Sequence, residues 1–328
     1  MILAGDVGGT HARLALFEGG DPQPREIEIY PSAAHDSLVE IVRLYRAEHA
    51  EEIAAATIGV AGPVSGGRTE AVNLAWPVDA RDLASPLELH AGAVAVINDM
   101  EANAWGVPAL GEDDLVTLGG GEPDRDGNIA LISAGTGLGH AFATRCDGEL
   151  QAHPSEGGHV DFAPRTKLEA ELREWVARDW EHVSFELVCS GVGLLNTYEF
   201  LRTRSSEPEP EWLRDDRGAR GAVAITEAGL QRRDPVATEA LDLLVSMYGA
   251  QAGNMALAVM ATGGVYLGGG IAPKILPRLR EGAFMRAFTD KGRLSDVVER
   301  IPVWVIRNEL TALLGAARHA HRRAESRP

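Results

Sequence analysis

The same local pattern occurs twice in this sequence, at residues 2–17 and at residues 129–144. In each copy an apolar run leads into a glycine-rich turn that contains a threonine, and a second apolar run follows. Two strands joined by a glycine turn are typical of a β-hairpin. The interval between the copies is far longer than the repeat of a solenoid protein. The pattern therefore predicts two related domains, each opening with a glycine-turned hairpin.

The length of the chain agrees with two domains. A chain of 328 residues exceeds the size at which a single hydrophobic core stops growing. Further strands are expected at 57–60, 94–97 and 303–306, and helices at 37–49, 167–179, 235–261 and 312–323. Strands mixed with helices predict the α/β class. We expect the domain boundary near residues 108–114 and an exposed loop at 202–221.

The charge of the chain argues against several classes of partner. The formal net charge is -17 at pH 7, so no general positive field attracts nucleic acid or an anionic membrane. Cys146 and Cys189 lie in unrelated contexts, which predicts neither a disulfide scaffold nor a structural zinc site. The first apolar run contains Asp6 and has no basic leader, so we expect a cytoplasmic protein without a signal peptide. The basic stretch 319–328 is interpreted as the solvated end of a helix.

The charge-free segment 243–273 is as long as a membrane span. Gln251 and the glycines at 268–270 interrupt it, and a spanning helix would have to carry that glycine run through lipid. We therefore expect a buried helix that ends near Ala261, followed by a strand from Val265 and a glycine turn.

Two glycine turns have the composition of phosphate-binding loops. Such a loop needs backbone N–H groups that face one point, and glycine permits the positive φ and the close approach that this requires. The candidate residues are Gly5, Asp6, Val7, Gly8, Gly9 and Thr10 in the first turn, and Gly135, Thr136 and Gly137 in the second. A strand follows each turn, so neither is a Walker A loop or a dinucleotide fingerprint. A plain hairpin turn is the alternative for either one alone.

A third glycine turn, formed by Gly268, Gly269 and Gly270, follows an apolar strand. Glycines there would let a flat ring lie against the backbone, which favours adenine; close strand–helix packing is the alternative. Asp6, in the first turn, is a candidate carboxylate for Mg²⁺, with a water molecule between the carboxylate and the ion.

Asn98 and Asp99 stand at the end of the apolar run 94–97. Functional groups of α/β proteins gather at the carboxyl ends of strands. There Asp99 can accept a proton from a substrate hydroxyl while Asn98 bonds the neighbouring hydroxyl. The alternative is that one of the two residues caps the following helix, and both roles can coexist.

Two further polar groups are candidates for binding a ligand. Glu156 and His159 flank a Gly-Gly turn, an arrangement that suits a polyhydroxylated ligand, with a zinc site as the rival interpretation. Glu186 is expected in the first turn of a helix that Ser184 caps. The helix dipole alone would account for an acidic residue at that position.

Six motifs occur in an order and spacing that resemble the bacterial glucokinase family. They are Gly-Asp-Val-Gly-Gly-Thr (5–10), Ile-Asn-Asp (97–99), Gly-Thr-Gly-Leu-Gly (135–139), Glu-Gly-Gly-His-Val-Asp-Phe-Ala-Pro (156–164), Ser-Gly-x-Gly-Leu (190–194) and Gly-Gly-Val-Tyr-Leu-x-Gly-Gly-Ile (263–271). The resemblance implies an actin-like ATPase fold of the ribonuclease H-like type, with two α/β domains and a cleft between them. We expect the small domain to comprise residues 1–108 and about 302–328, and the large domain residues 109–301.

The resemblance also implies an activity: transfer of the γ-phosphate of MgATP to the 6-hydroxyl of glucose. It assigns Asp99 as the general base. The implied sugar-binding residues are Asn98, Asp99, Glu156, His159 and Glu186, and the glycine turns would hold ATP. A homodimer is usual in the family. The alternatives are a kinase for another hexose or an amino sugar, and a non-catalytic sugar sensor of the same fold.

The sequence departs from the family at two positions. His11 stands where the family usually has Asn, which would alter hydrogen bonding in the first turn, and Val192 stands where it usually has Pro. The zinc-cysteine signature of the related ROK group is missing from the sequence, which places the chain with the metal-free glucokinases.

Overall fold

The computed structural model describes residues 1–70, 74, 76–146, 148–206, 210 and 219–325. The chain forms two compact units. The first comprises Met1–Asp113, Ala141–Ser155 and Asn308–Pro328, and the second Asp114–His140 and Glu156–Arg307. Residues 109–113, 141–155 and 302–307 thus belong to a different unit from the domain in which we expected them, and the domain limits stay a prediction. Most of the loop expected at 202–221 lies outside the described residues.

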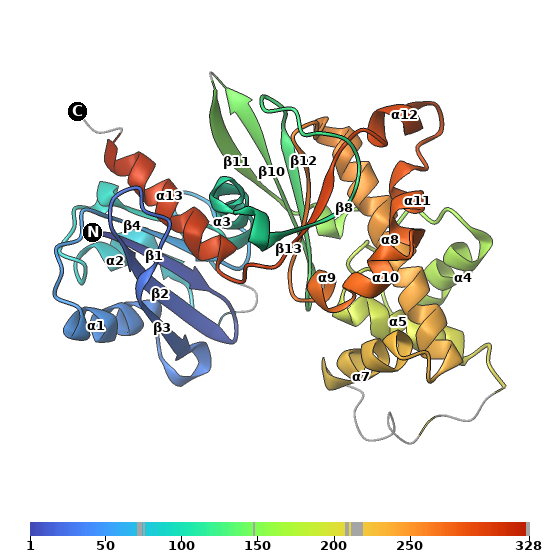
Figure 1. Ribbon diagram of the computed structural model, residues 1–328. Coiled ribbons are helices and arrows are strands. Elements are labelled where there is room, and N and C mark those ends of the chain that lie inside the picture. Colours follow the sequence, from blue (N-terminus) through green and yellow to red (C-terminus); the bar gives the residue numbers. More distant parts are fainter. Residues whose placement is uncertain (71–73, 75, 147, 207–209, 211–218, 326–328) are drawn as a thin grey trace. The chain divides into compact units, whose positions relative to one another are not determined.

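A five-stranded sheet with the order β3-β2-β1-β4-β7 forms the centre of the first unit (Figure 1). The pairings β3–β2 and β2–β1 are antiparallel, whereas β1–β4 and β4–β7 are parallel. Its strands are β1 (Ile2–Val7), β2 (His11–Phe17), β3 (Arg25–Pro31), β4 (Ala55–Val60) and β7 (Val94–Asn98). The other elements are β5 (Arg68–Thr69), β6 (Val78–Asp79), β11 (Glu149–Ser155), α1 (Leu38–Glu48), α2 (Ala80–Ala84), α3 (Asp99–Gly106) and α13 (Thr311–Glu325).

Side chains of this sheet alternate between two hydrophobic clusters. Leu3 and Val7 of β1 pack with residues of α1 and α2, while Ile2 and Ala4 pack with residues of α13. Successive side chains of a strand point to opposite faces, so each face is covered by a different set of helices. The helix expected at 37–49 is confirmed as α1, which Ser37 caps by accepting the Glu40 N–H.

The second unit is built on strands in the order β9-β12-β13-β8. β12 pairs parallel with β9 and with β13, and β13 pairs antiparallel with β8. These strands are β8 (Leu115–Gly119), β9 (Ile129–Ala134), β12 (Gly264–Gly268) and β13 (Val303–Ile306); β10 (Leu138–Cys146) begins in this unit. The helices are α4 (Lys167–Val176), α5 (Gly191–Arg202), α7 (Ala219–Leu230), α8 (Pro235–Val259), α9 (Ile271–Lys274), α10 (Leu276–Arg280), α11 (Ala283–Thr289) and α12 (Ser295–Val298).

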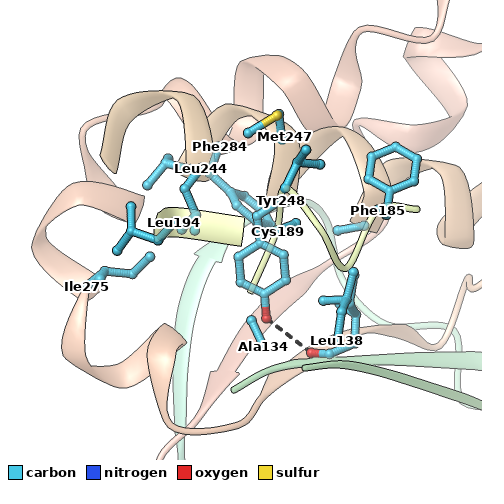
Figure 2. Packing of buried hydrophobic residues seen from close by; sticks show 14 of the residues in the cluster. Ala134, Leu138, Phe185, Cys189, Leu194, Leu244, Met247, Tyr248, Ile275 and Phe284 are labelled. Atoms are coloured by element: carbon cyan, nitrogen blue, oxygen red, sulfur yellow. Dashed lines mark hydrogen bonds between the residues drawn. The ribbon is translucent and has the colours of Figure 1, made fainter. Parts of the chain in front are cut away.

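Tyr248 of α8 lies in the middle of the core of the second unit. Figure 2 shows its ring beside Cys189 and Phe284, and the Phe284 ring meets it edge-on at 5.6 Å between centroids. The buried Tyr248 hydroxyl donates a hydrogen bond to the carbonyl oxygen of Ile132 at 3.1 Å. This bond satisfies a polar group that would otherwise be costly to bury, and it ties α8 to β9. The glycine turn at 135–139 follows directly after β9.

The charge-free segment folds as expected. The helix expected at 235–261 is confirmed as α8, and β12 confirms the strand from Val265. Among the described residues, every helix is too short or too polar to cross a membrane. The strand and helix mixture also confirms the α/β class.

The interpretation of residues 319–328 as a solvated helix end is wrong for two side chains. Nδ1 of His319 lies 3.0 Å from Oγ1 of Thr57, and burial lowers the pKa of the His319 imidazole to about 4. The guanidinium of Arg322 lies over the Trp105 ring, 5.3 Å from its centroid. His319 and Arg322 therefore pack within the first unit and do not simply extend into water.

Candidate active site

The turn after β1 is braced by a side chain that the sequence did not suggest. Within the turn, the Gly8 N–H donates to the carbonyl oxygen of His11 at 2.9 Å. Oγ of the buried Ser32 donates to the Gly8 carbonyl at 2.7 Å, and the Ser32 N–H donates to the Thr10 carbonyl at 3.0 Å. Thr10 itself is exposed. The Thr10 hydroxyl is therefore accessible to a ligand, while the two hydrogen bonds from Ser32 hold the backbone of the turn in place.

Asp6 has an environment that fits a nearby cation. Burial raises the pKa of its carboxyl, and the charge of Arg13 lowers it in part. Nη1 of Arg13 lies 4.0 Å from Oδ2 of Asp6, at the limit of an ion pair. A half-buried carboxylate with one distant guanidinium gains from a second positive charge. Mg²⁺ prefers carboxylate and water oxygens, so Asp6 fits the expected role of holding the ion through water.

Asn98 caps α3, as one of the alternatives for this residue predicted. Its Oδ1 accepts the N–H groups of Met100 and Glu101 at 2.9 and 3.1 Å. Its Nδ2 donates to the Gly62 carbonyl at 3.0 Å. The side chain is 5% exposed, so most of its hydrogen-bonding capacity is used within the protein.

Asp99 is the first residue of α3 and is partly exposed. Its Oδ1 accepts the N–H of Met100 at 2.9 Å, which orients the carboxyl group at the start of the helix. The positive end of the helix dipole stabilises a negatively charged carboxylate at this position. A carboxylate held there can accept a proton from a hydroxyl group that approaches it.

Within the first unit, the strand register places Asp99 and the first glycine turn at one edge of the sheet. Val7 pairs with Val60, and Val60 pairs with Asn98, so three parallel strands end in one row. Neighbouring strands lie about 4.8 Å apart, which puts the ends of β1 and β7 roughly 10 Å from each other. The expectation that polar groups gather at the carboxyl ends of the strands holds for this unit.

Gly59 sets how closely α3 approaches the sheet, and sequence reasoning missed it. A Cβ atom at Gly59 would lie 2.9 Å from Cβ of Ala102 and 3.7 Å from Cα of Asp99. Any side chain on this face of β4 would therefore push α3 and Asp99 outward. Gly62, which holds Asn98, was also missed; the Gly-Val-Ala-Gly-Pro run at 59–63 was the available signal.

In the second unit, Glu186 is bonded to the glycine turn at 135–139. Its Oε2 accepts the N–H of Leu138 at 2.9 Å. A Cβ atom at Gly137 would lie 2.4 Å from that same oxygen, so the contact requires glycine. The Gly191 N–H also donates to the Gly135 carbonyl at 2.8 Å. Thr136 is exposed at the tip of the turn.

His159 and the Gly-Gly turn lie against Glu186. Nδ1 of His159 is 3.9 Å from Oε1 of Glu186, and the Glu186 N–H donates to the Gly158 carbonyl at 3.0 Å. Gly158 is required because a Cβ there would lie 1.8 Å from the Leu138 carbonyl oxygen. Glu156 and His159 are both exposed, so their polar atoms are accessible to a ligand.

The expected helix start at Ser184 and Glu186 is wrong. Ser184 pairs with Asp161 in an isolated β-bridge, and the helix α5 begins only at Gly191. Ser190 is the residue that caps it, with Oγ accepting the Gly193 N–H at 3.0 Å. Because Glu186 lies in a turn, its carboxylate is explained by its contacts with Leu138 and not by a helix dipole.

The third glycine turn stands beside the second. Gly268 of β12 pairs with Ser133 of β9, so the two turns follow neighbouring parallel strands. Gly269 has φ +78°, and a Cβ there would lie 2.4 Å from the Ala134 carbonyl oxygen. A Cβ at Gly270 would meet nothing within 4 Å, which leaves space for a flat ring.

The expected positive φ is absent from both phosphate-loop candidates. No glycine of the described turns 5–10 and 135–139 has positive φ. A Cβ at Gly5 would lie 2.6 Å from Cδ1 of Ile58, and Gly137 meets Glu186 as described above. Gly5 and Gly137 are thus explained by close packing and not by left-handed backbone.

The predicted residues thus fall into two groups. Asn98, Asp99 and the turn at 5–10 belong to the first unit, and the remaining candidates belong to the second. Within the second unit, the structure brings the sugar-binding candidates Glu186 and His159 to the turn expected to hold phosphate.

Comparisons with known proteins agree with these motifs. A family model described as Glucokinase matches residues 3–323. The chain is 38% identical over 335 residues to a glucokinase of Nostoc punctiforme, with 97% of this chain and 98% of the relative covered. A crystal structure of glucokinase from an Antarctic psychrotroph is 30% identical with a TM-score of 0.85, and 98% of each chain is covered.

A more distant structure shares the fold. It is a ROK family glucokinase from Streptomyces griseus in complex with glucose and AMPPNP, 20% identical, with a TM-score of 0.67 and 98% of this chain and 99% of that chain covered. These likenesses confirm the actin-like ATPase fold expected from the sequence. The extent and identity of the sequence matches show that the chain belongs to the bacterial-type glucokinase family, distinct from the ROK group.

Proposed function

We propose that this chain is an ATP-dependent glucokinase, which transfers the γ-phosphoryl group of MgATP to the 6-hydroxyl of glucose. The observation that carries the proposal is the position of Asp99, at the start of α3 and on the same sheet edge as the Gly5–Thr10 motif. An acceptor for the hydroxyl proton and a turn suited to phosphate thus lie at the same end of the parallel strands of one sheet. Full-length relatives named glucokinase support the choice of glucose.

Asp99 acts as the general base. It takes the proton of the glucose 6-hydroxyl as the new bond forms between that oxygen and the γ-phosphorus. The bond from the γ-phosphorus to the bridging oxygen breaks, and ADP leaves with the electron pair. Such a transfer depends on positioning and on charge stabilisation more than on covalent chemistry.

The other candidates position the two substrates. Glu156, His159 and Glu186 accept and donate hydrogen bonds to the sugar hydroxyls, and Asn98 contributes its remaining donor capacity. The turns at 5–10 and 135–139 bind the phosphates through backbone N–H groups and the hydroxyls of Thr10 and Thr136. Gly270, which leaves open space, accepts the adenine ring. A fold neighbour solved with glucose and AMPPNP, an ATP analogue, supports this pair of ligands.

Mg²⁺ accompanies ATP, and Asp6 would hold it through water. When bound, the ion neutralises the charge that develops on the phosphate oxygens. We also place the enzyme in the cytoplasm as a homodimer, on the family resemblance. Sedimentation equilibrium tests the dimer, with a mass of twice 35.0 kDa expected and a mass of 35.0 kDa contradicting it.

A panel of sugars tests the proposed substrate. Purified protein is assayed for ADP release with MgATP and glucose, mannose, fructose, galactose or glucosamine. We expect kcat/KM for glucose to exceed that of every other sugar by about tenfold or more, because the site is built to bond particular hydroxyls. A higher value for another sugar identifies a different hexose or amino-sugar kinase. Glucose binding without ADP release identifies a sugar sensor.

A further inference from the structure

A cavity of about 450 Å³ lies within the first unit, and none of the proposed catalytic residues lines it. Its apolar wall includes Ile2 and Phe17 at the sheet and Trp105 at the end of α3, and residues of α13 close its other side. Cavities of this volume with an apolar wall and a few polar groups are typical of sites for small molecules.

The polar groups of the cavity come mainly from the last two turns of α13. Nη1 of Arg322 donates to the Leu150 carbonyl at 2.9 Å while its guanidinium lies over the Trp105 ring. Two carboxylates of the lining face basic partners: Oε2 of Glu149 lies 3.8 Å from Nη1 of Arg322, and Oε1 of Glu325 lies 3.4 Å from Nε2 of His321. A third carboxylate of the lining, Asp21, accepts the Gln23 N–H on Oδ1 at 2.9 Å.

Arg318 differs from its basic neighbours. It lines the same cavity, and its exposed side chain makes no hydrogen bond or ion pair with any residue that the structure describes. Partial burial lowers the pKa of its guanidinium, and the charge of Glu149 acts in the opposite direction. A guanidinium that has no hydrogen-bonded partner in the protein can accept an anion as its partner.

The helix dipole also stabilises basic residues at the C-terminal end of a helix. This is the alternative explanation for Arg318 and Arg322. The dipole does not require an aromatic ring under one guanidinium, nor a cavity beside the other. The fixed plane of Arg322 on Trp105 instead offers a flat, positively charged surface next to the apolar wall.

The cavity is connected to the proposed general base, Asp99, through direct contact between α13 and α3. A Cβ atom at Gly106 would lie 2.1 Å from the Thr311 carbonyl oxygen, and one at Gly315 would lie 1.7 Å from the Ala102 carbonyl oxygen. The backbones of α3 and α13 are therefore in direct contact, and Figure 1 shows the two helices side by side. α3 is eight residues long, with Trp105 in its last turn and Asp99 as its first residue.

We propose that this cavity binds a small organic anion with a flat apolar body, and that the bound molecule changes turnover by shifting α3. The anionic group contacts Arg318, and the apolar body lies between the Arg322–Trp105 pair and the wall of the cavity. The effect on turnover rests on the proposed function, whereas the binding itself does not.

Calorimetric titration of the full-length protein tests the binding. Phenyl phosphate is the probe, with benzoate and benzyl alcohol in parallel, and saturating glucose and AMPPNP occupy the proposed substrate sites. We expect phenyl phosphate or benzoate to bind, and the tighter of the two identifies the anionic group that the cavity recognises. Arg318→Ala should weaken binding about tenfold, equal to about 1.4 kcal/mol. Arg43→Ala, an exposed arginine of α1, should leave it unchanged.

Three results would overturn the site: no binding up to about 10 mM, equal binding of benzyl alcohol, or unchanged affinity in Arg318→Ala. The coupling is tested separately by kcat and KM with and without the bound probe, where we expect a change of at least about fivefold that Arg318→Ala abolishes. Binding without any kinetic change refutes the coupling. Protein that lacks glucokinase activity but still binds the probe refutes the proposed function and leaves the anion site standing.

Discussion

The carboxylate of Glu186 accepts a hydrogen bond from the backbone N–H of Leu138 at 2.9 Å. This bond joins a candidate for sugar binding to the turn expected to hold phosphate. The other carboxylate oxygen of Glu186 faces His159 at 3.9 Å. One side chain therefore fixes the relative position of two parts of the proposed site, so a change at either part is expected to affect both substrates.

Gly137→Ala tests this relationship. The new methyl group would lie 2.4 Å from Oε2 of Glu186. The carboxylate must therefore move away and lose its hydrogen bond with the Leu138 N–H. We expect a loss of about 1–3 kcal/mol in the free energy of unfolding, measured by urea denaturation, together with higher KM values for glucose and for ATP.

The matched control is Gly135→Ala, because a Cβ at Gly135 meets nothing within 4 Å. This control should unfold at the wild-type urea concentration, and it should raise only the KM for ATP if phosphate approaches the turn there. Wild-type stability and wild-type KM values in Gly137→Ala would contradict the assigned role of Glu186.

Gly59→Ala should displace α3. Its methyl group would lie 2.9 Å from Cβ of Ala102, and relief requires α3 to move away from β4 together with Asp99. Small shifts of a reacting group strongly reduce catalysis, so we expect kcat to fall about tenfold or more while the protein remains folded.

The double variant Gly59→Ala/Ala102→Gly provides the check, since it removes the methyl group that Gly59→Ala would meet. Part of the lost kcat should return, although glycine inside α3 costs about 1 kcal/mol in helix stability. If the second change restores nothing, steric pressure on α3 is not the cause.

Two buried histidines should make the protein less stable in mild acid. Burial lowers the pKa of both His140 and His319 to about 4, below the ordinary value of 6.5. Between these values the unfolded chain binds protons that the folded chain does not. The free energy of unfolding therefore falls as the pH falls from about 6.5 to about 4, by up to about 1.4 kcal/mol per pH unit and histidine.

Urea denaturation at several pH values measures this slope, and His140→Gln isolates one histidine. Burial raises the pKa values of the Asp6 and Glu101 carboxyls, so these two groups make the folded protein more stable as the pH falls. They do so equally in wild type and in His140→Gln. The difference between wild type and variant is thus the informative quantity. An identical pH dependence in the two proteins would show that His140 does not titrate as proposed.

Elements with strong local signals could be predicted from the sequence. The long charge-free run that includes most of α8 and the apolar run of β7 predicted the positions of these elements to within a few residues. The order of the glycine turns and the Asn-Asp pair also indicated the family, because these motifs are short and local.

Roles that depend on tertiary contacts could not be predicted. Ser32 braces Gly8 across 24 positions of the chain, and Gly59 is required only because Ala102 packs onto it. Ser184 looked like a helix cap, but the Glu186 N–H is already bonded to the Gly158 carbonyl. The cavity beside α13 is lined by residues from distant parts of the chain. In the sequence, its arginines have only the pattern of an ordinary basic helix end.

The measurement that tests the central claim most directly is turnover of Asp99→Asn with glucose and MgATP, beside its glucose affinity by calorimetry. The amide keeps the shape of the side chain but cannot take the hydroxyl proton, so we predict a fall in kcat of about 10²–10⁴-fold with glucose affinity within about threefold of wild type. Asp82→Asn, an exposed first-turn aspartate of α2, serves as the control and should keep wild-type turnover. Asp99→Asn protein that retained a tenth or more of wild-type kcat would contradict the account.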